Sequence, residues 1–143
     1  MVTEVVLDSS VIISLVTIED HSAWARQKLS EYRYFHILDL NYYEVGNALR
    51  YKQSAKFSMK DAEKAFKEAV EFMDLLGVHS FREVVIDAMN LALKLNIAVY
   101  DAAFLFLADK LNTRLLTLDL KLTKALENTR FRELIECPTK RQK

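Results

Sequence analysis

Four acidic side chains occupy positions where a folded chain could bring them together. Asp8 and Asp119 each follow a short apolar run that is typical of a buried β-strand. Asp101 precedes a long apolar run typical of a buried helix, and Glu44 lies inside a helical pattern with apolar neighbours. In parallel sheets, ligands gather at the carboxyl ends of the strands. The sequence therefore predicts that these carboxylates meet at one edge of a sheet.

Such a cluster would have a definite chemistry. Carboxylates held close together repel one another, and some would be forced neutral unless a cation lay among them. Oxygen-only ligand sets suit the hard ions Mg²⁺ and Mn²⁺, and the absence of histidine from these four segments argues against zinc. Such ions commonly serve phosphate chemistry. Residue types and spacing alone thus indicate a possible Mg²⁺ or Mn²⁺ site for phosphoryl transfer or phosphodiester hydrolysis.

Each acid also has a purely structural explanation. Asp8, Asp101 and Asp119 all precede helical patterns, and aspartate is among the best N-caps, worth about 1 kcal/mol to a helix. Taken singly, each aspartate is best explained as a cap. Glu44 could face water at the edge of its apolar stripe, although burial of a carboxylate is costly without compensation. The combination of all four favours a site.

The elements that must position these acids alternate between strands and helices. The strands are continuously apolar, which favours a parallel sheet covered by helices on both faces, and the chain has only 2 Gly and 1 Pro. We therefore expect a helix-rich, single-domain α/β/α sandwich. Ser58 should cap a long helix that ends at Gly77, and a following helix should stop near Asn96. The segments VHSF and ELIEC should be short and extended.

Bulk properties limit the function less than the motifs do. The 143 residues fit one domain, which we place at 1–137, with a basic and mobile tail at 138–143. A formal net charge of +0 excludes a globally basic nucleic-acid binder but not a local basic patch. No signal peptide is evident, and the apolar run AAFLFLA is far shorter than the roughly 20 residues of a membrane span. We expect a soluble, cytoplasmic protein without a membrane partner.

Three segments in order carry a resemblance to a known family. VVLDSSVII, NYYEVGNAL and VYDAAFLFLADKLNTRLLTLDLKL resemble the PIN-domain family, and within it the VapC-like toxins of toxin–antitoxin pairs. The similarity extends from Val5 to about Leu126. Each motif is short, and their order together with the T-x-D of residues 117–119 makes the match specific. All four acids of the family pattern are present.

The resemblance implies a PIN-like fold and a Mg²⁺- or Mn²⁺-dependent endoribonuclease that cuts RNA. It assigns four catalytic and metal-binding acids, and three supporting polar residues: Asp8, Glu44, Asp101 and Asp119, with Ser10, Asn47 and Thr117. It further implies a homodimer that is silenced by an antitoxin protein. The region from Leu15 to Leu29 and the helix that carries Phe66 are candidate partner surfaces.

Basic residues that follow the Glu44 segment are candidates for contact with the RNA backbone. Arg50, Lys52 and Lys56 are the best placed, although a run of this kind is more often a solvated helix end. Two alternatives remain for the function: a stand-alone PIN ribonuclease of RNA maturation, and a PIN module that binds RNA or protein without cutting. A haloacid-dehalogenase phosphatase is disfavoured because Ser10 stands where its D-x-D motif needs a second aspartate. A receiver domain is disfavoured because the adjacent acidic pair is missing.

Overall fold

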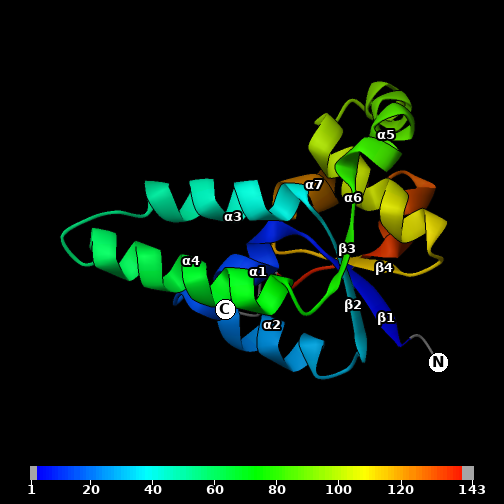
Figure 1. Ribbon diagram of the computed structural model, residues 1–143. Helices are drawn as coiled ribbons and strands as arrows, with labels where there is room; N and C mark the ends of the chain where they lie inside the picture. Colours follow the sequence, from blue (N-terminus) through cyan, green and yellow to red (C-terminus); the bar gives the residue numbers. More distant parts are fainter. Residues whose placement is uncertain (1–2, 140–143) are drawn as a thin grey trace.

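A five-stranded parallel sheet forms the centre of the molecule. The computed structural model of the chain describes residues 3–139 (Figure 1). The strands are arranged in the order β3-β2-β1-β4-β5, and every neighbouring pair is parallel. Their bounds are β1 Glu4–Leu7, β2 Tyr34–Leu38, β3 Gly77–His79, β4 Arg114–Leu116 and β5 Ile135–Glu136. The extended segments expected in VHSF and ELIEC are confirmed as the two edge strands.

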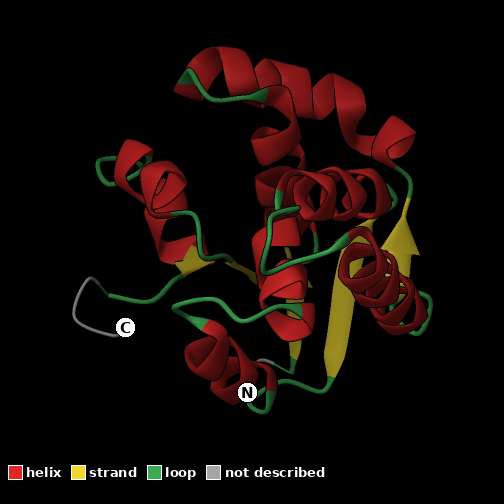
Figure 2. Cartoon of the chain, turned by 90° about the vertical axis from the view of Figure 1, so that its left-hand side faces the viewer, coloured by secondary structure: helices red, strands yellow, loops and turns green. Residues whose placement is uncertain are grey.

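Helices cover both faces of this sheet (Figure 2). On one face lie α1 Ser9–Val16, α2 Ser22–Leu29, α3 Leu40–Tyr51 and α4 Met59–Met73. On the other lie α5 Phe81–Leu95, α6 Val99–Lys110, α7 Leu120–Ala125 and a 3₁₀-helix, η1, Arg130–Leu134. Figure 1 shows α3 and α4 side by side as an arm that projects away from the sheet. The predicted α/β/α architecture is confirmed.

The strands are apolar throughout because they are buried on both faces. Val6 and Leu115 pack with α5, α6 and α7, whereas Val5 and Leu7 pack with α1, α3 and α4. All four side chains are completely buried. Successive residues of a strand point to opposite faces, so a run such as VVL fills two core layers at once. Helix α6, which carries Asp101, is buried along most of its length, as its sequence predicts.

The boundaries of α4 and α5 follow the expected caps at Ser58 and Asn96, but not at Gly77. Ser58 caps α4 through a reciprocal pair of hydrogen bonds with Asp61, and Asn96 ends α5 in the left-handed conformation with φ of 55°. Gly77 does not end α4, which finishes at Met73. Gly77 instead begins β3, where a Cβ atom would lie 3.1 Å from Nδ1 of His36. The glycine therefore serves close packing between β2 and β3 rather than a helix terminus.

The sequence also predicts a basic tail at 138–143 and no membrane-spanning segment. Most of the predicted tail, residues 140–143, lies outside the described residues. Within residues 3–139, no single helix is long and apolar enough to cross a membrane. Only α5 and α6 taken together reach such a length, and the two are bent by 109° at their junction.

Candidate active site

Asp8 lies directly after β1 and is almost completely buried, with 9% of its surface exposed. Its Oδ1 accepts hydrogen bonds from the backbone N–H of Ser10, at 3.0 Å, and from the Ser10 hydroxyl. Its Oδ2 accepts one from the hydroxyl of Thr117. Burial raises the pKa of Asp8 from 3.8 to about 6, and these hydrogen bonds offset part of the rise. Asp8 is therefore both the N-cap of α1 and a carboxylate withdrawn from water.

Thr117 joins two of the predicted acids. It is fully buried just after β4, and while its hydroxyl donates to Asp8 it accepts from the backbone N–H of Asp119 at 3.0 Å. The side chain of Asp119 accepts the N–H groups of Lys121 and Leu122, both at 3.0 Å, and so caps α7. The neighbouring ends of β1 and β4 are thereby joined through side chains as well as through the sheet.

Glu44 reaches the same edge from α3. The hydroxyl of Ser9 donates to Oε1 of Glu44 at 2.8 Å, and burial raises the pKa of this carboxyl. Behind Ser9 lies Asn41, which is completely buried. The Asn41 amide donates to the Ser9 hydroxyl and to the carbonyl of Leu7, both at 3.3 Å, and accepts from the N–H of Leu38 at 2.8 Å. Asn41 thus fixes the start of α3 to β1 and β2.

Neither Ser9 nor Asn41 was assigned a role by the sequence motifs. Asn41 lies three residues before Glu44, and positions three apart lie on the same side of a helix. A polar residue in the first turn of the helix that follows a buried strand, one turn before a candidate ligand, is the signal that could have identified it.

Asp101 is the residue whose structural explanation proves wrong. The N-cap of α6 is Ala98, and Asp101 lies in the first helical turn. Burial is the main cause that raises the pKa of Asp101 to about 6, and the negative charges of Asp119, Asp8 and Glu44 raise it further, in that order. Three acids can raise this pKa only if they lie near Asp101. The structure therefore brings all four predicted acids into one electrostatic cluster.

The cluster has the donor chemistry of a site for a hard cation. Its ligand atoms are carboxylate and hydroxyl oxygens, which Mg²⁺ and Mn²⁺ prefer. The raised pKa values of Asp8 and Asp101 reflect burial and, at Asp101, repulsion that a cation would relieve. Among the residues that the structure describes, no three His, Cys, Asp or Glu side chains already form a closed metal-binding group. The four acids fit a divalent ion by chemistry and charge.

A third strand-end aspartate shows that position alone does not place an acid in the cluster. Asp39 follows β2, and its Oδ1 accepts the backbone N–H of Phe81 at 2.9 Å. Its own N–H donates to the carbonyl of His79. Asp39 thus joins the ends of β2 and β3 to the start of α5, and its charge does not contribute to the raised pKa of Asp101.

The predicted RNA-binding residues lie beyond the cluster along α3. Lys52 forms an ion pair with Glu19. It lines a hollow of about 350 Å³ that begins at Ser10, beside the acids, and also a larger one of about 720 Å³ that Lys56 lines as well. Arg50 is exposed and lies over the ring of Tyr51, 5.2 Å from its centroid. Lys52 therefore lies between the two hollows, and Lys56 lines only the one farther from the acids.

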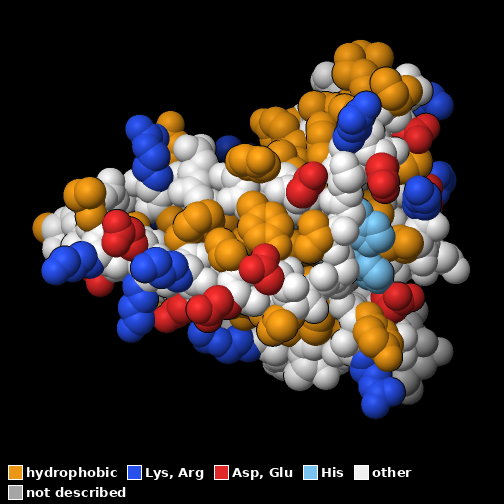
Figure 3. All heavy atoms as spheres, viewed as in Figure 1, with side chains coloured by type: hydrophobic (Ala, Val, Ile, Leu, Met, Phe, Trp, Pro, Cys, Tyr) orange, Lys and Arg blue, Asp and Glu red, His pale blue; other side chains and the backbone are white. Residues whose placement is uncertain are grey.

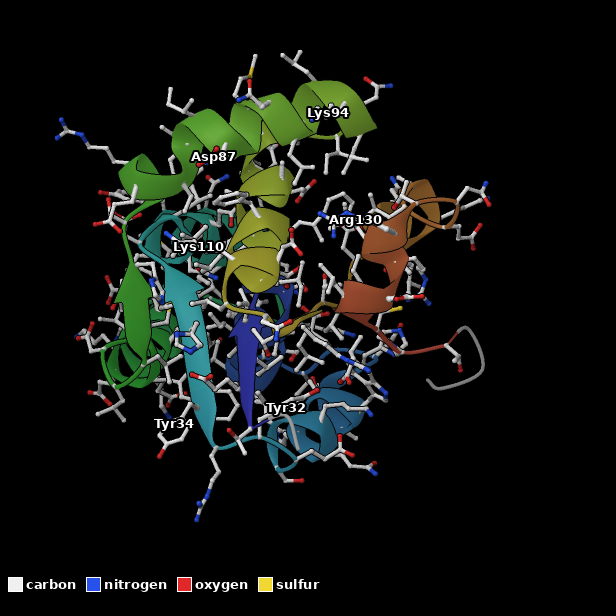
Figure 4. The ribbon with its side chains drawn as sticks, turned by 90° about the vertical axis from the view of Figure 1, so that its right-hand side faces the viewer. Tyr32, Tyr34, Asp87, Lys94, Lys110 and Arg130 are labelled. Atoms are coloured by element: carbon white, nitrogen blue, oxygen red, sulfur yellow. The ribbon has the colours of Figure 1, made fainter. Side chains whose placement is uncertain are left out.

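The predicted role of Asn47 remains a prediction. Its side chain is exposed on α3 one turn beyond Glu44, and within residues 3–139 it makes no hydrogen bond. A separate hollow of about 450 Å³ lies between α5, α6 and η1, where Figure 4 shows Lys94 and Arg130 on opposite sides. Its Asp109 pairs with Arg130 at 3.0 Å and is about 12 Å along α6 from Asp101. This hollow is distinct from the acid cluster.

Comparison with known proteins decides the family. The model of the PIN domain matches residues 5–127, a stretch that includes all four acids. The chain belongs to the PIN-domain family. The resemblance noted in the three sequence segments is thereby confirmed, and it extends over the whole sheet except β5.

Individual PIN-domain proteins agree with this result. The chain is 39% identical over 122 residues to Ribonuclease VapC3 of Pyrobaculum aerophilum, covering 85% of this chain and 93% of that protein. A chain in a toxin–antitoxin complex from Klebsiella pneumoniae superposes with a TM-score of 0.69 at 14% identity, covering 94% and 98% of the two chains. A chain of VapBC2 from Rickettsia felis, bound to a promoter DNA fragment, gives a TM-score of 0.63 at 13% identity and the same coverage. The two solved structures share the fold.

Proposed function

We propose that this protein is a divalent-metal-dependent endoribonuclease of the VapC type that hydrolyses RNA phosphodiester bonds. The observation that carries the proposal is the raised pKa of Asp101, caused by burial and by three further acids from separate elements of the fold. Such a concentration of buried negative charge is costly unless a cation binds there. The 39% identity to Ribonuclease VapC3 supports RNA as the substrate.

Asp8 and Asp101 would hold the ion directly, and Glu44 and Asp119 would complete the site, partly through bound water. A bound Mg²⁺ or Mn²⁺ would neutralise the acids, polarise the phosphate and favour ionisation of the attacking water. The ion is needed for a second reason, because four carboxylates without it would repel the phosphate backbone.

The chain's own residues then orient the reacting groups. The hydroxyls of Ser10 and Thr117 fix both oxygens of Asp8, so this carboxylate cannot rotate. Ser9 holds only Oε1 of Glu44, and within the described part of the chain Oε2 accepts no hydrogen bond. Oε2 of Glu44 is therefore free to accept a proton from the attacking water, and so is Oδ2 of Asp119, because both hydrogen bonds that the Asp119 carboxylate accepts from the described residues go to Oδ1. Lys52 and Lys56 would contact flanking phosphates along the two hollows that they line.

The protein would act as the toxin of a toxin–antitoxin pair in the cytoplasm, where its RNA substrate is found. The larger hollow, between the end of α1 and α4, is the best site for the antitoxin. Its lining includes apolar Val16 and Phe57 beside Lys56 and Lys64, which suits a peptide with apolar and acidic residues. A homodimer would bury exposed apolar residues of α5, such as Ile86 and Leu93, which are 74% and 69% exposed.

The decisive experiment is cleavage of a mixed-sequence fluorogenic RNA by the purified protein with Mg²⁺, Mn²⁺ or EDTA. We expect cleavage with either ion, none with EDTA, and none by Asp101→Asn. Asp87→Asn, which removes an exposed acid on α5, is the matched control and should cut normally. A folded protein that binds Mn²⁺ but cuts no RNA would favour a PIN module that only binds. Equal cleavage by Asp101→Asn would refute the proposed site.

The antitoxin proposal needs a separate test, because a stand-alone ribonuclease of RNA maturation would use the same acids. Expression of the chain alone should arrest growth, and Asp101→Asn should relieve the arrest. Unimpeded growth with a demonstrably active enzyme would favour the stand-alone ribonuclease.

A further inference from the structure

Two histidines that are far apart in the sequence meet between the edge strand β3 and its neighbour β2. Nδ1 of His36, on β2, lies 3.0 Å from Nε2 of His79, the last residue of β3. Their ring centroids are 5.1 Å apart. Sequence motifs gave neither residue a role, because 43 positions separate them and only the parallel pairing of β2 with β3 brings them together.

A carboxylate determines which nitrogen of His36 carries a proton. Nε2 of His36 lies 2.9 Å from Oε1 of Glu4, which can only accept a hydrogen bond when ionised. His36 therefore keeps its proton on Nε2, and its Nδ1 presents a lone pair toward His79. A carboxylate that orients an imidazole in this way, with the other nitrogen free to coordinate, is the usual outer shell of a histidine metal ligand.

The surrounding chain leaves room for this arrangement. Gly77 lies opposite His36 in the β2–β3 pairing, and a Cβ atom there would be 3.1 Å from Nδ1 of His36. Any other residue at this position would crowd the nitrogen that faces His79. The pair is half-buried but reaches the surface, where histidine side chains form one patch (Figure 3).

We propose that His36 and His79 bind a transition-metal ion of the Zn²⁺ class, through Nδ1 and Nε2 respectively, with water completing the coordination. Tetrahedral zinc with bonds of about 2.0 to 2.1 Å needs its two nitrogens about 3.3 Å apart, which is a small widening of the present 3.0 Å. Zinc binding would require His79 to move its proton from Nε2, where it now bridges the two rings, to Nδ1, so that both coordinating nitrogens present lone pairs. Glu4 would act as a positioning residue that does not touch the metal.

The local charges permit such an ion. The negative charge of Glu83 raises the pKa of His79 and so favours a positive charge near this ring. The positive charge of Lys110 lowers the same pKa. The pKa of His79 is lowered, mainly by burial and next by His36, so the ring is neutral and able to coordinate at neutral pH. A bound ion would clamp the edge strand β3 to β2, beside the link that Asp39 makes to α5.

The test is calorimetric titration of the tag-free, EDTA-treated full chain with Zn²⁺, in excess Mg²⁺ to occupy the acid cluster. A Cys137→Ser background removes the single thiol of the chain as a competing ligand. We expect one zinc per chain, and at least tenfold weaker binding in His36→Gln and in His79→Gln. Glu4→Gln should weaken binding by roughly tenfold or more, because a carboxylate that orients a histidine ligand typically contributes that much. His21→Gln is the matched control and should bind normally.

Imidazole ¹⁵N shifts provide a readout that a purely structural role would not change. On addition of Zn²⁺, the signals of His36 Nδ1 and His79 Nε2 should move together while His21 stays unchanged. Zinc affinity that is unaffected by His36→Gln and His79→Gln, or the absence of binding to a folded wild-type chain, would overturn the proposal and leave the pair as an N–H···N hydrogen bond. Because the readout is binding at the sheet edge, either result is independent of the ribonuclease activity.

Discussion

Replacement of Asp8 by asparagine tests the energetic argument for the acid cluster directly. The pKa of Asp8 rises from 3.8 to about 6 on folding. A tenfold change in proton affinity corresponds to about 1.36 kcal/mol, so above pH 7 the ionised Asp8 destabilises the metal-free folded state by about 3 kcal/mol. Asparagine has no charge to bury. Its amide, however, cannot accept both the Ser10 and the Thr117 hydrogen bonds as the carboxylate does, a loss of about 1 kcal/mol.

The sign of the effect depends on pH. The folded state binds the Asp8 proton more tightly than the unfolded state, so the contribution of Asp8 to stability falls as pH rises from about 4 through about 6 and is constant above about 7. At pH 7.5 we expect Asp8→Asn to raise the free energy of unfolding by about 2 kcal/mol. At pH 4, where the wild-type carboxyl is already neutral in the folded state, only the weaker hydrogen bonding remains and the variant should be no more stable than wild type.

Urea denaturation in EDTA at pH 4, 5, 6 and 7.5 measures this difference. Asp87→Asn, at an exposed position on α5, should show no pH-dependent difference from wild type. An NMR titration adds a second test, because removal of the Asp8 charge should lower the pKa of Asp101. If Asp8→Asn were destabilised equally at every pH, the carboxylate would be a structural residue and the argument for a strained cluster would be refuted.

Three further changes have expected outcomes. Mn²⁺ affinity should weaken by roughly tenfold or more between pH 7 and pH 5, since protons compete for carboxyls whose pKa is about 6; calorimetry that shows no change would exclude Asp8 and Asp101 as ligands. Gly77→Ala should lower stability by about 1 kcal/mol and weaken zinc binding at the strand edge, because the added Cβ would displace the His36 ring. Urea melts and zinc titration measure these effects, and an unchanged variant would contradict the packing argument. Lys52→Met should weaken RNA binding and reduce its salt slope by about 1, whereas Lys94→Met, on α5, should leave the slope unchanged.

The sheet and its acids could be predicted from local sequence because each depends on short-range signals. A continuously apolar run predicts a strand buried on both faces, and a polar residue at its end marks the carboxyl edge. Asp8 and Asp119 satisfy both conditions, and Thr117 lies between the second strand and its aspartate. The alternation of strands and helices predicts a parallel sheet whose carboxyl ends share one edge. That β1 and β4 are neighbours in it, and so bring Asp8 and Asp119 together, is shown by the structure alone.

The polar contacts that hold the acids in place could not be predicted in this way. Asn41 bonds three separate segments, and the partners of its amide lie 34 and 32 residues away. The His36 and His79 pair depends on the register of β2 with β3, which no local pattern specifies. The cap assigned to Asp101 was wrong because the start of α6 does not depend on a local capping signal. Ala98 is the N-cap although it has no capping side chain, since the helix is stabilised by burial of its apolar faces.

The structural and functional explanations of Asp8 can now be compared by magnitude. Asp8 does cap α1, and an N-cap is worth about 1 kcal/mol. Its burial costs about 3 kcal/mol once it is ionised, so capping alone does not account for a carboxylate in this position. An exposed cap such as Ser58 provides the same stabilisation to α4 without that cost. The difference between these two free energies is explained if the ionised Asp8 binds a cation. An ion that binds only the folded protein stabilises it and so offsets the cost of burying the charge.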